Sequence, residues 1–116
     1  MISAVQESVR RDRERSLWDR QAAGYERQAL RTYRHAYELS IAKVRAVLAP
    51  EHRVLEIGCG TGIIALGLAP YARQVVGVDI SPRMIAMAQG KPEAMQAGNV
   101  EFCVCDGYAL PYEDQT

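Results

Sequence analysis

The chain has 116 residues, of which 48% are hydrophobic and 24% charged, and its formal net charge is zero. This length permits one domain or part of one, and it excludes a two-lobed enzyme. The balanced charge gives no sign of a nucleic-acid partner, and no run of about 18 apolar residues predicts a membrane span.

The three cysteines are an odd number in apolar stretches, and the first residues lack the apolar core of a signal peptide. Both features favour reduced thiols in a cytoplasmic protein over a disulfide framework. No cluster of Cys and His accompanies them, so we expect no metal site.

Residues 1–50 are rich in Arg, Glu, Gln, Ala and Leu, which favour helix, and contain one glycine, Gly24. A helix is predicted over about residues 4–20, a break or bend at Gly24, and an amphipathic helix over residues 32–48 that Pro50 ends. The arginines are interleaved with acids, which is typical of a solvated helix face.

From residue 51 the pattern changes to short strands alternating with helices. Strands are predicted over residues 53–57, 74–79 and 100–105, and helices over residues 61–69 and 82–89. Alternation at this spacing predicts an α/β fold in which parallel strands are joined by crossover helices.

The stretch VLEIGCGTG places Glu56 at the end of the first strand, followed by Gly58, Gly60 and Gly62. In parallel sheets, ligands bind at the carboxyl ends of the strands, where glycines let the backbone approach them. A dinucleotide motif would need Gly or Ala at the position of Ile63, and Glu56 would repel a pyrophosphate. A carboxylate beside the turn suits a cationic ligand without phosphate, such as S-adenosylmethionine.

Two further acids end the other strands. Asp79 follows the second strand at a position suited to a ribose diol, because a carboxylate accepts both hydroxyl protons. Asp106 follows the third strand, where it can accept a hydrogen bond from an adenine amino group. Three strand-end acids beside a glycine turn are hard to explain by packing.

At these residues the chain resembles the class I S-adenosylmethionine-dependent methyltransferases. The stretches VLEIGCGTG, VVGVDIS and NVEFCVCDGYALPYED are similar to successive motifs of that family, in wording closest to its small-molecule and quinone-type members. The stretch WDRQAAGYE resembles the segment that lies over the cofactor in that group.

The resemblance implies a Rossmann-like parallel sheet. It makes residues 51–116 the S-adenosylmethionine-binding half of a methyltransferase domain and residues 1–50 a helical lid or cap. The cofactor-binding residues that it and the motif analysis suggest are Tyr25, Glu56, Gly58, Cys59, Gly60, Gly62, Asp79, Ile80, Met84, Asp106 and Gly107. No catalytic residue is assigned, because methyl transfer proceeds mainly by proximity and orientation.

In the family, the LPYED segment leads into a fourth strand and three more, whereas this chain ends at Thr116. We expect either a chain truncated before the acceptor-binding half or a complete short protein. In both cases the first strand is an exposed apolar edge, which predicts a homodimer or oligomer.

The leading hypothesis is methyl transfer from S-adenosylmethionine to a small-molecule acceptor, with S-adenosylhomocysteine as product. The alternative is a non-catalytic S-adenosylmethionine-binding or assembly protein that oligomerises through its open sheet edge. A nicotinamide-binding oxidoreductase fragment is disfavoured by Glu56 and Ile63.

Overall fold

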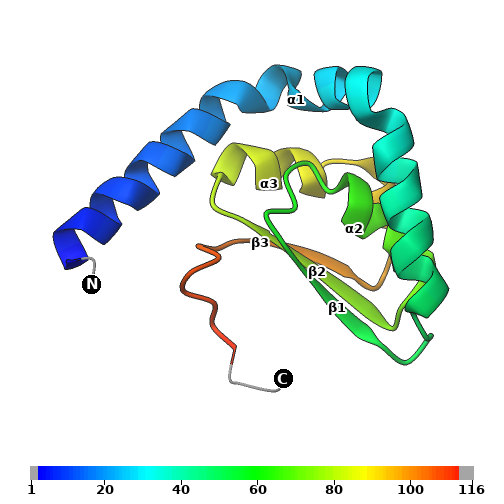
Figure 1. The fold of residues 1–116 in the computed structure, drawn as a ribbon. Coiled ribbons are helices and arrows are strands. Elements are labelled where there is room, and N and C mark those ends of the chain that lie inside the picture. The colour runs from blue at the N-terminus through cyan, green and yellow to red at the C-terminus, as the bar shows by residue number, and fades with distance from the viewer. Residues whose placement is uncertain (1–2, 113–116) are drawn as a thin grey trace.

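The computed structural model describes residues 3–112, in which one long helix precedes alternating strands and helices (Figure 1). In chain order, the elements are α1 (Ala4–Val47), β1 (Arg53–Ile57), α2 (Ile63–Leu68), the 3-10 helix η1 (Ala69–Tyr71), β2 (Gln74–Asp79), α3 (Pro82–Gln89), α4 (Pro92–Gln96) and β3 (Val100–Val104). The predicted alternation of strands and helices is confirmed. Residues 113–116, which end the LPYED segment and the chain, lie outside the described residues.

The three strands form one parallel sheet in the order β1-β2-β3. Glu56 of β1 lies opposite Gly77 of β2, which in turn lies opposite Phe102 of β3. This register brings the carboxyl ends of all three strands to one edge of the molecule. The parallel α/β fold expected from the sequence is therefore present, with β1 at the edge of the described sheet.

The helices lie on one face of the sheet, and α1 arches over α2 and α3 toward the carboxyl ends of the strands (Figure 1). The core between sheet and helices is built from small and medium apolar side chains around one aromatic ring, that of Phe102. It consists of Cys59, Ala65, Leu68, Ala69, Val75, Ile85, Ala88 and Phe102. The second half of α1 joins this core through Ile41, whose side chain lies over Gly67 of α2.

The opposite face of the sheet carries no helix in residues 3–112 (Figure 1). Leu55 is 40% exposed there and Ile57 is 56% exposed. The segment after β3 approaches this face, since a Cβ on Gly107 would lie 2.7 Å from Ile57 Cγ2. Within residues 3–112, strand β1 thus has an edge that pairs with no other strand, together with exposed apolar side chains.

The expected pair of N-terminal helices, separated at Gly24, is wrong. The helix α1 runs through Gly24 and bends at Tyr33, whose φ of −122° and ψ of 19° are not helical (Figure 1). Glycine in a helix interior costs only about 1 kcal/mol, and contacts on either side of Gly24 hold the helix to the body. On those two sides Asp19 accepts a hydrogen bond from Ser81, and Glu26 accepts one from Thr61.

Several element boundaries also differ from the prediction by one or two residues. Helix α2 begins at Ile63 instead of residue 61, because Gly62 takes a left-handed conformation with φ of 84°. Strand β3 ends at Val104 instead of residue 105. Helix α3 begins as expected, with Ser81 Oγ accepting a hydrogen bond from Met84 N at 3.1 Å. No helix within residues 3–112 is long and apolar enough to cross a membrane.

Candidate ligand-binding site

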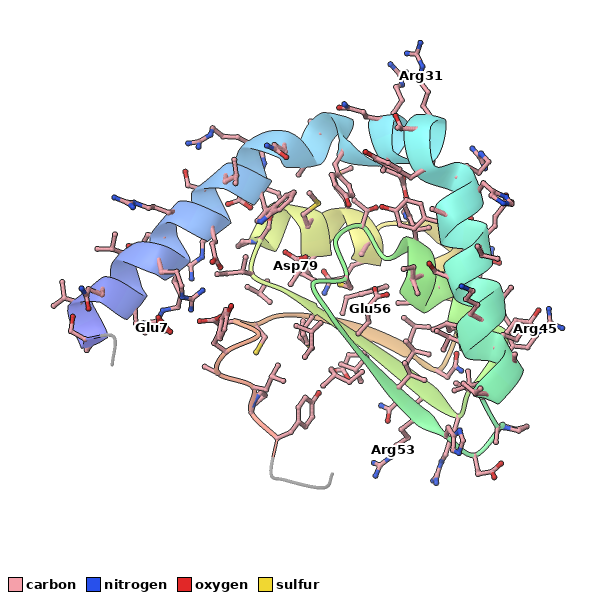
Figure 2. The ribbon with its side chains drawn as sticks, in the orientation of Figure 1. Glu7, Arg31, Arg45, Arg53, Glu56 and Asp79 are labelled. Carbon is pink, nitrogen blue, oxygen red and sulfur yellow. The ribbon has the colours of Figure 1, made fainter. Side chains whose placement is uncertain are left out.

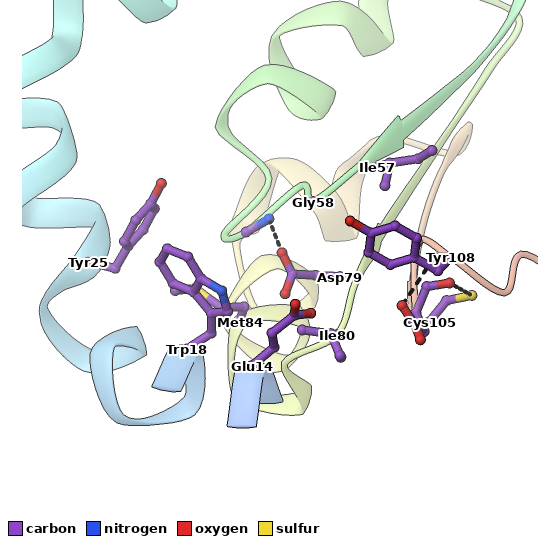
Figure 3. Close-up of a pocket in the computed structure, with 13 residues that line it drawn as sticks. Glu14, Trp18, Tyr25, Ile57, Gly58, Asp79, Ile80, Met84, Cys105 and Tyr108 are labelled. Atoms are coloured by element: carbon purple, nitrogen blue, oxygen red, sulfur yellow. Dashed lines mark hydrogen bonds between the residues drawn. The ribbon is translucent and has the colours of Figure 1, made fainter. Parts of the chain in front are cut away.

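A pocket of about 260 Å³ lies between α1 and the carboxyl ends of the strands (Figure 3). Its thirteen lining residues come from α1, the end of β1 and the glycine turn, the end of β2 and the start of α3, and the segment after β3. They are Glu14, Trp18, Tyr25, Ile57, Gly58, Gly60, Asp79, Ile80, Met84, Cys105, Asp106, Gly107 and Tyr108. The pocket therefore lies where ligands bind in open parallel sheets.

The glycine turn after β1 has the backbone that its sequence predicted. Gly58, Gly60 and Gly62 all have positive φ, at 72°, 56° and 84°. At Gly62 space is limiting as well, because a Cβ would lie 2.7 Å from Phe102 Cζ. Residues with side chains are strained in this conformation, so the turn depends on glycine.

Asp79 links the turn to α3 from the end of β2. Its Oδ2 accepts a hydrogen bond from Gly60 N at 2.9 Å (Figure 3). Its Oδ1 accepts one from Ser81 N at 2.9 Å. A carboxylate has about four lone-pair positions, so each oxygen can accept a further bond from a ligand hydroxyl. Asp79 thus shapes the turn and presents acceptors to the pocket.

Asp106, at the other end of the pocket, is bonded to α1. Arg10 Nη2 donates to Asp106 Oδ2 at 2.6 Å, and Tyr108 N donates to Asp106 Oδ1 at 3.1 Å. Burial works to raise the pKa of Asp106, but the Tyr108 N–H and the Arg10 guanidinium outweigh it, so the pKa is lowered. The Arg10 guanidinium also lies 4.5 Å from the centroid of the Tyr108 ring.

Glu56 lines a second, smaller cavity of about 60 Å³ beside the main pocket. Both Glu56 and Asp79 lie between the sheet and the arch of α1 (Figure 2). Burial raises the pKa of Glu56 to about 7, the backbone N–H of Ala65 opposes this, and the charge of Asp79 adds to it. The two cavities share Tyr25 and Gly58, so they adjoin at the glycine turn.

The structure brings most of the predicted site residues together. Eight line the main pocket: Tyr25, Gly58, Gly60, Asp79, Ile80, Met84, Asp106 and Gly107. Glu56 and Cys59 line the smaller cavity, where burial raises the pKa of the Cys59 thiol to about 12. Gly62 lines neither cavity and is packed against Phe102.

Sequence reasoning placed Trp18 in the segment that resembles a cover over the cofactor, but it missed Glu14, which lines the pocket, and Arg10, which contacts Asp106. Arg10, Glu14 and Trp18 are spaced by four residues, which places them on one face of a helix. That spacing indicates that these side chains share one face of a helix. The expected break at Gly24 concealed that the same helix continues to Tyr25. Tyr37 reaches the smaller cavity only because of the bend at Tyr33, and no local pattern indicates that bend.

Two polar clusters hold α1 over the pocket. Asp19 Oδ1 accepts hydrogen bonds from Ser81 Oγ at 2.5 Å and from Arg83 N at 3.2 Å. Glu26 accepts a hydrogen bond from Thr61 Oγ1 at 3.2 Å and forms an ion pair with Lys91. Both clusters attach α1 to the loops that surround the site, so the helix forms one wall of the pocket.

The charges of the main pocket limit what it can bind. Of its described lining residues, three are carboxylates and none is Lys or Arg. A pyrophosphate would meet repulsion here, whereas hydroxyl donors, an amino group and a cation would meet acceptors. The residues present therefore fit S-adenosylmethionine, which has a ribose, an adenine amino group and two cationic centres.

The fold and the site define a Rossmann-like α/β domain with a pocket, lined by three carboxylates, at the carboxyl ends of its strands. Residues 54–116 match the family model described as "Methyltransferase domain". The chain belongs to this family, and its class is that of the class I S-adenosylmethionine-dependent methyltransferases.

Among curated proteins, the chain is 36% identical over 66 residues to "Uncharacterized methyltransferase YcgJ" of Bacillus subtilis, covering 57% of this chain and 26% of that protein. It is 42% identical over 88 residues to "Demethylmenaquinone methyltransferase" of Thermus thermophilus, covering 73% of this chain and 36% of that protein. The chain thus spans about a third or less of the length of these relatives.

Among solved structures, the "DhpI-SAH complex structure" matches with a TM-score of 0.68 and 26% identity, covering 82% of this chain and 44% of that chain. The crystal structure of YcgJ matches with a TM-score of 0.60 and 34% identity, covering 68% of this chain and 33% of that chain. Both matches support the partial methyltransferase fold.

Proposed function

We propose that this chain binds S-adenosylmethionine in the pocket beneath α1 and is the cofactor-binding part of a methyltransferase that acts on a small molecule. One observation carries the proposal. Asp79 and Asp106, from the ends of adjacent strands, line one pocket beside a turn of positive-φ glycines. In the proposed complex, the ribose diol donates hydrogen bonds to Asp79 and the adenine amino group donates one to Asp106.

Each residue has a distinct part in the proposed complex. Asp79 accepts from the ribose hydroxyls with the lone pairs that Gly60 and Ser81 leave free. Ile80 and the buried Met84 flank the adenine, whose amino group donates to Asp106. Glu56 and the Gly58–Gly62 turn hold the methionine end, and Tyr25 covers the site from α1.

The bound cofactor supplies a methyl group on a sulfonium, which is a good leaving group. The chain's residues then need only orient the ligand and exclude water, since proximity provides much of the rate. The acceptor is proposed to be a small molecule because the match that covers 73% of this chain is named for demethylmenaquinone.

Calorimetric titration with S-adenosylmethionine, S-adenosylhomocysteine and NAD tests the binding. The first two ligands should bind and NAD should not, because Glu56 beside the glycine turn and the carboxylates of the main pocket would repel a pyrophosphate. Asp79→Asn should weaken the binding of S-adenosylhomocysteine by about 1–3 kcal/mol, because a charged hydrogen-bond acceptor is lost. Tight NAD binding would overturn the proposal, and a thermal unfolding scan of the variant checks that the turn is retained.

An assembly role is the second candidate, and the exposed β1 edge supports it. Leu55 and Ile57 leave apolar surface beside backbone groups of β1 that no other strand of the described part of the chain pairs with, which favours pairing with another strand. We propose a homodimer or oligomer of this chain through that edge. A protein that assembles and binds S-adenosylmethionine, but transfers no methyl group to any acceptor offered, would fit this candidate.

A further inference from the structure

The smaller cavity has a distinct composition. Its lining residues are Tyr25, Tyr37, Glu56, Gly58, Cys59, Thr61, Ile63 and Ile64. Its volume of about 60 Å³ is small beside the 260 Å³ of the main pocket, which suits a small polar group at the end of a larger ligand. Because it adjoins the main pocket at Tyr25 and Gly58, one ligand can extend from one cavity into the other.

The bend of α1 creates the tyrosine pair of this cavity. In a straight helix, residues twelve positions apart are separated by about 18 Å along the axis. Here the hydroxyls of Tyr25 and Tyr37 lie 3.3 Å apart, and Tyr33, where the helix departs from helical geometry, lies between them in sequence. The bend therefore turns the second half of the helix back so that Tyr37 faces the site.

The polar side chains around the cavity are suited to a cation. A carboxylate and two phenol oxygens can accept hydrogen bonds, and no Lys, Arg or His is among the described lining residues. Burial and then the bond to Tyr25 raise the pKa of Tyr37 to about 12, so its hydroxyl stays neutral and can point its lone pair at a ligand. An ammonium group meets both the size and the charge of this set.

We propose that Tyr37 is a further specificity-determining residue of the site, which completes with Tyr25 and Glu56 an oxygen-lined seat for the ligand's ammonium group. This inference rests on the proposed binding of S-adenosylmethionine. It predicts that the chain distinguishes ligands with an amino-acid end from nucleosides that lack one. The contribution of Tyr37 is thereby separate from that of Asp79 and Asp106 at the nucleoside end.

The test compares two ligands that share the adenosine and the sulfur. S-adenosylhomocysteine carries the amino-acid end, and 5′-methylthioadenosine ends in a methyl group. In Tyr37→Phe, the affinity for S-adenosylhomocysteine should fall about three- to tenfold, the effect of one lost hydrogen bond, while that for 5′-methylthioadenosine stays constant. Glu56→Gln should reduce the same ligand preference further. Calorimetry measures both ligands, by displacement where direct heats are small.

Tyr71→Phe is the matched control, since it removes the same hydroxyl from a side chain of η1 that is 36% exposed and lines neither cavity. It should leave both affinities unchanged. If Tyr37→Phe weakens both ligands equally, Tyr37 acts through packing of α1 and the proposal is wrong, as it is if neither affinity changes. If the unmodified protein binds neither ligand, the proposed function itself is wrong. That outcome is distinct from any result of the Tyr37 comparison, which requires the unmodified protein to bind.

Discussion

Arg10 Nη2 lies 2.6 Å from Asp106 Oδ2, which joins the first turns of α1 to the segment that follows β3 across 96 residues of sequence. Arg10 is itself held by Glu7 at 3.0 Å and Glu14 at 2.8 Å. Asp106 and Glu14 both line the main pocket. The ion pair therefore fastens α1 across the end of the site where the adenine is proposed to lie.

Removing this ion pair should loosen the start of α1. In Arg10→Gln, the amide hydrogens of residues 4–14 should exchange faster, because the charge-assisted bond to Asp106 and the contact with Tyr108 are both lost. Hydrogen exchange followed by mass spectrometry gives the measurement. Trp18, the one tryptophan of the chain, should become easier to quench with acrylamide.

Arg31→Gln is the control for this experiment, because it makes the same charge change on α1 at a side chain that points away from the body (Figure 2). Its exchange should match that of the unmodified protein. Equal exchange in the Arg10 and Arg31 variants would mean that the Asp106 bond does not hold the helix.

Ligand binding should depend on pH through Glu56. Its pKa of about 7 reflects burial first, opposed by the Ala65 N–H, with Asp79 as the charge that adds to it. The proposed ammonium requires the ionised carboxylate, so affinity for S-adenosylhomocysteine should rise about tenfold from pH 6 to pH 8. Glu56→Gln should flatten this profile, and an unchanged profile in that variant would assign the titration to another group.

The free energy of unfolding should also depend on pH through Glu56, but it should fall as the pH rises, whereas the ligand affinity increases. Because the folded protein raises the pKa of Glu56 from 4.5 to about 7, the folded state holds the proton more tightly. The contribution of Glu56 to the free energy of unfolding is present below pH 4.5 and is lost as the pH rises to about 7. Urea unfolding at several pH values should show this loss in the unmodified protein, and Glu56→Gln should reduce it.

Two glycines should respond to alanine in opposite directions. Gly24 lies inside α1 with nothing within 4 Å of its Cβ position, so Gly24→Ala should raise the free energy of unfolding by about 0.5–1 kcal/mol. At Gly62, φ is 84° and an added Cβ would lie 2.7 Å from Phe102 Cζ. Gly62→Ala should therefore lower the free energy of unfolding by more than about 1 kcal/mol. Urea denaturation of both variants gives the comparison, and a destabilised Gly24→Ala would mean that α1 does not run through this position.

The proposed assembly through β1 predicts the oligomeric state. Size-exclusion chromatography with light scattering should find a dimer or larger species, and Leu55→Lys should shift it toward monomer by placing a charge on the apolar surface beside the edge. Val47→Lys is the control, since Val47 is 79% exposed at the end of α1. A clean monomer for the unmodified chain would refute the assembly proposal.

Local sequence signals were sufficient for the elements of the sheet. The ranges of β1, β2 and α3 agree with the prediction, because alternating apolar residues, Ser81 as a helix cap and the glycines after β1 each act over a few residues. The positions of Asp79 and Asp106 at the pocket followed as well, since parallel strands bring their carboxyl ends to one edge.

The arrangement of α1 could not be read in the same way. The unbroken helix through Gly24, the bend at Tyr33 and the pairing of Tyr25 with Tyr37 depend on contacts between distant segments. A glycine's cost of about 1 kcal/mol is small enough for such contacts to override.

The sequence by itself determined the parallel sheet, the glycine turn and the acids that face the pocket, because these follow from local conformational preference and strand order. Only the tertiary structure decided which part of α1 covers each cavity and that Arg10 holds Asp106. The physical reason is that the path of a long helix over a sheet is set by packing and ion pairs between residues far apart in the chain.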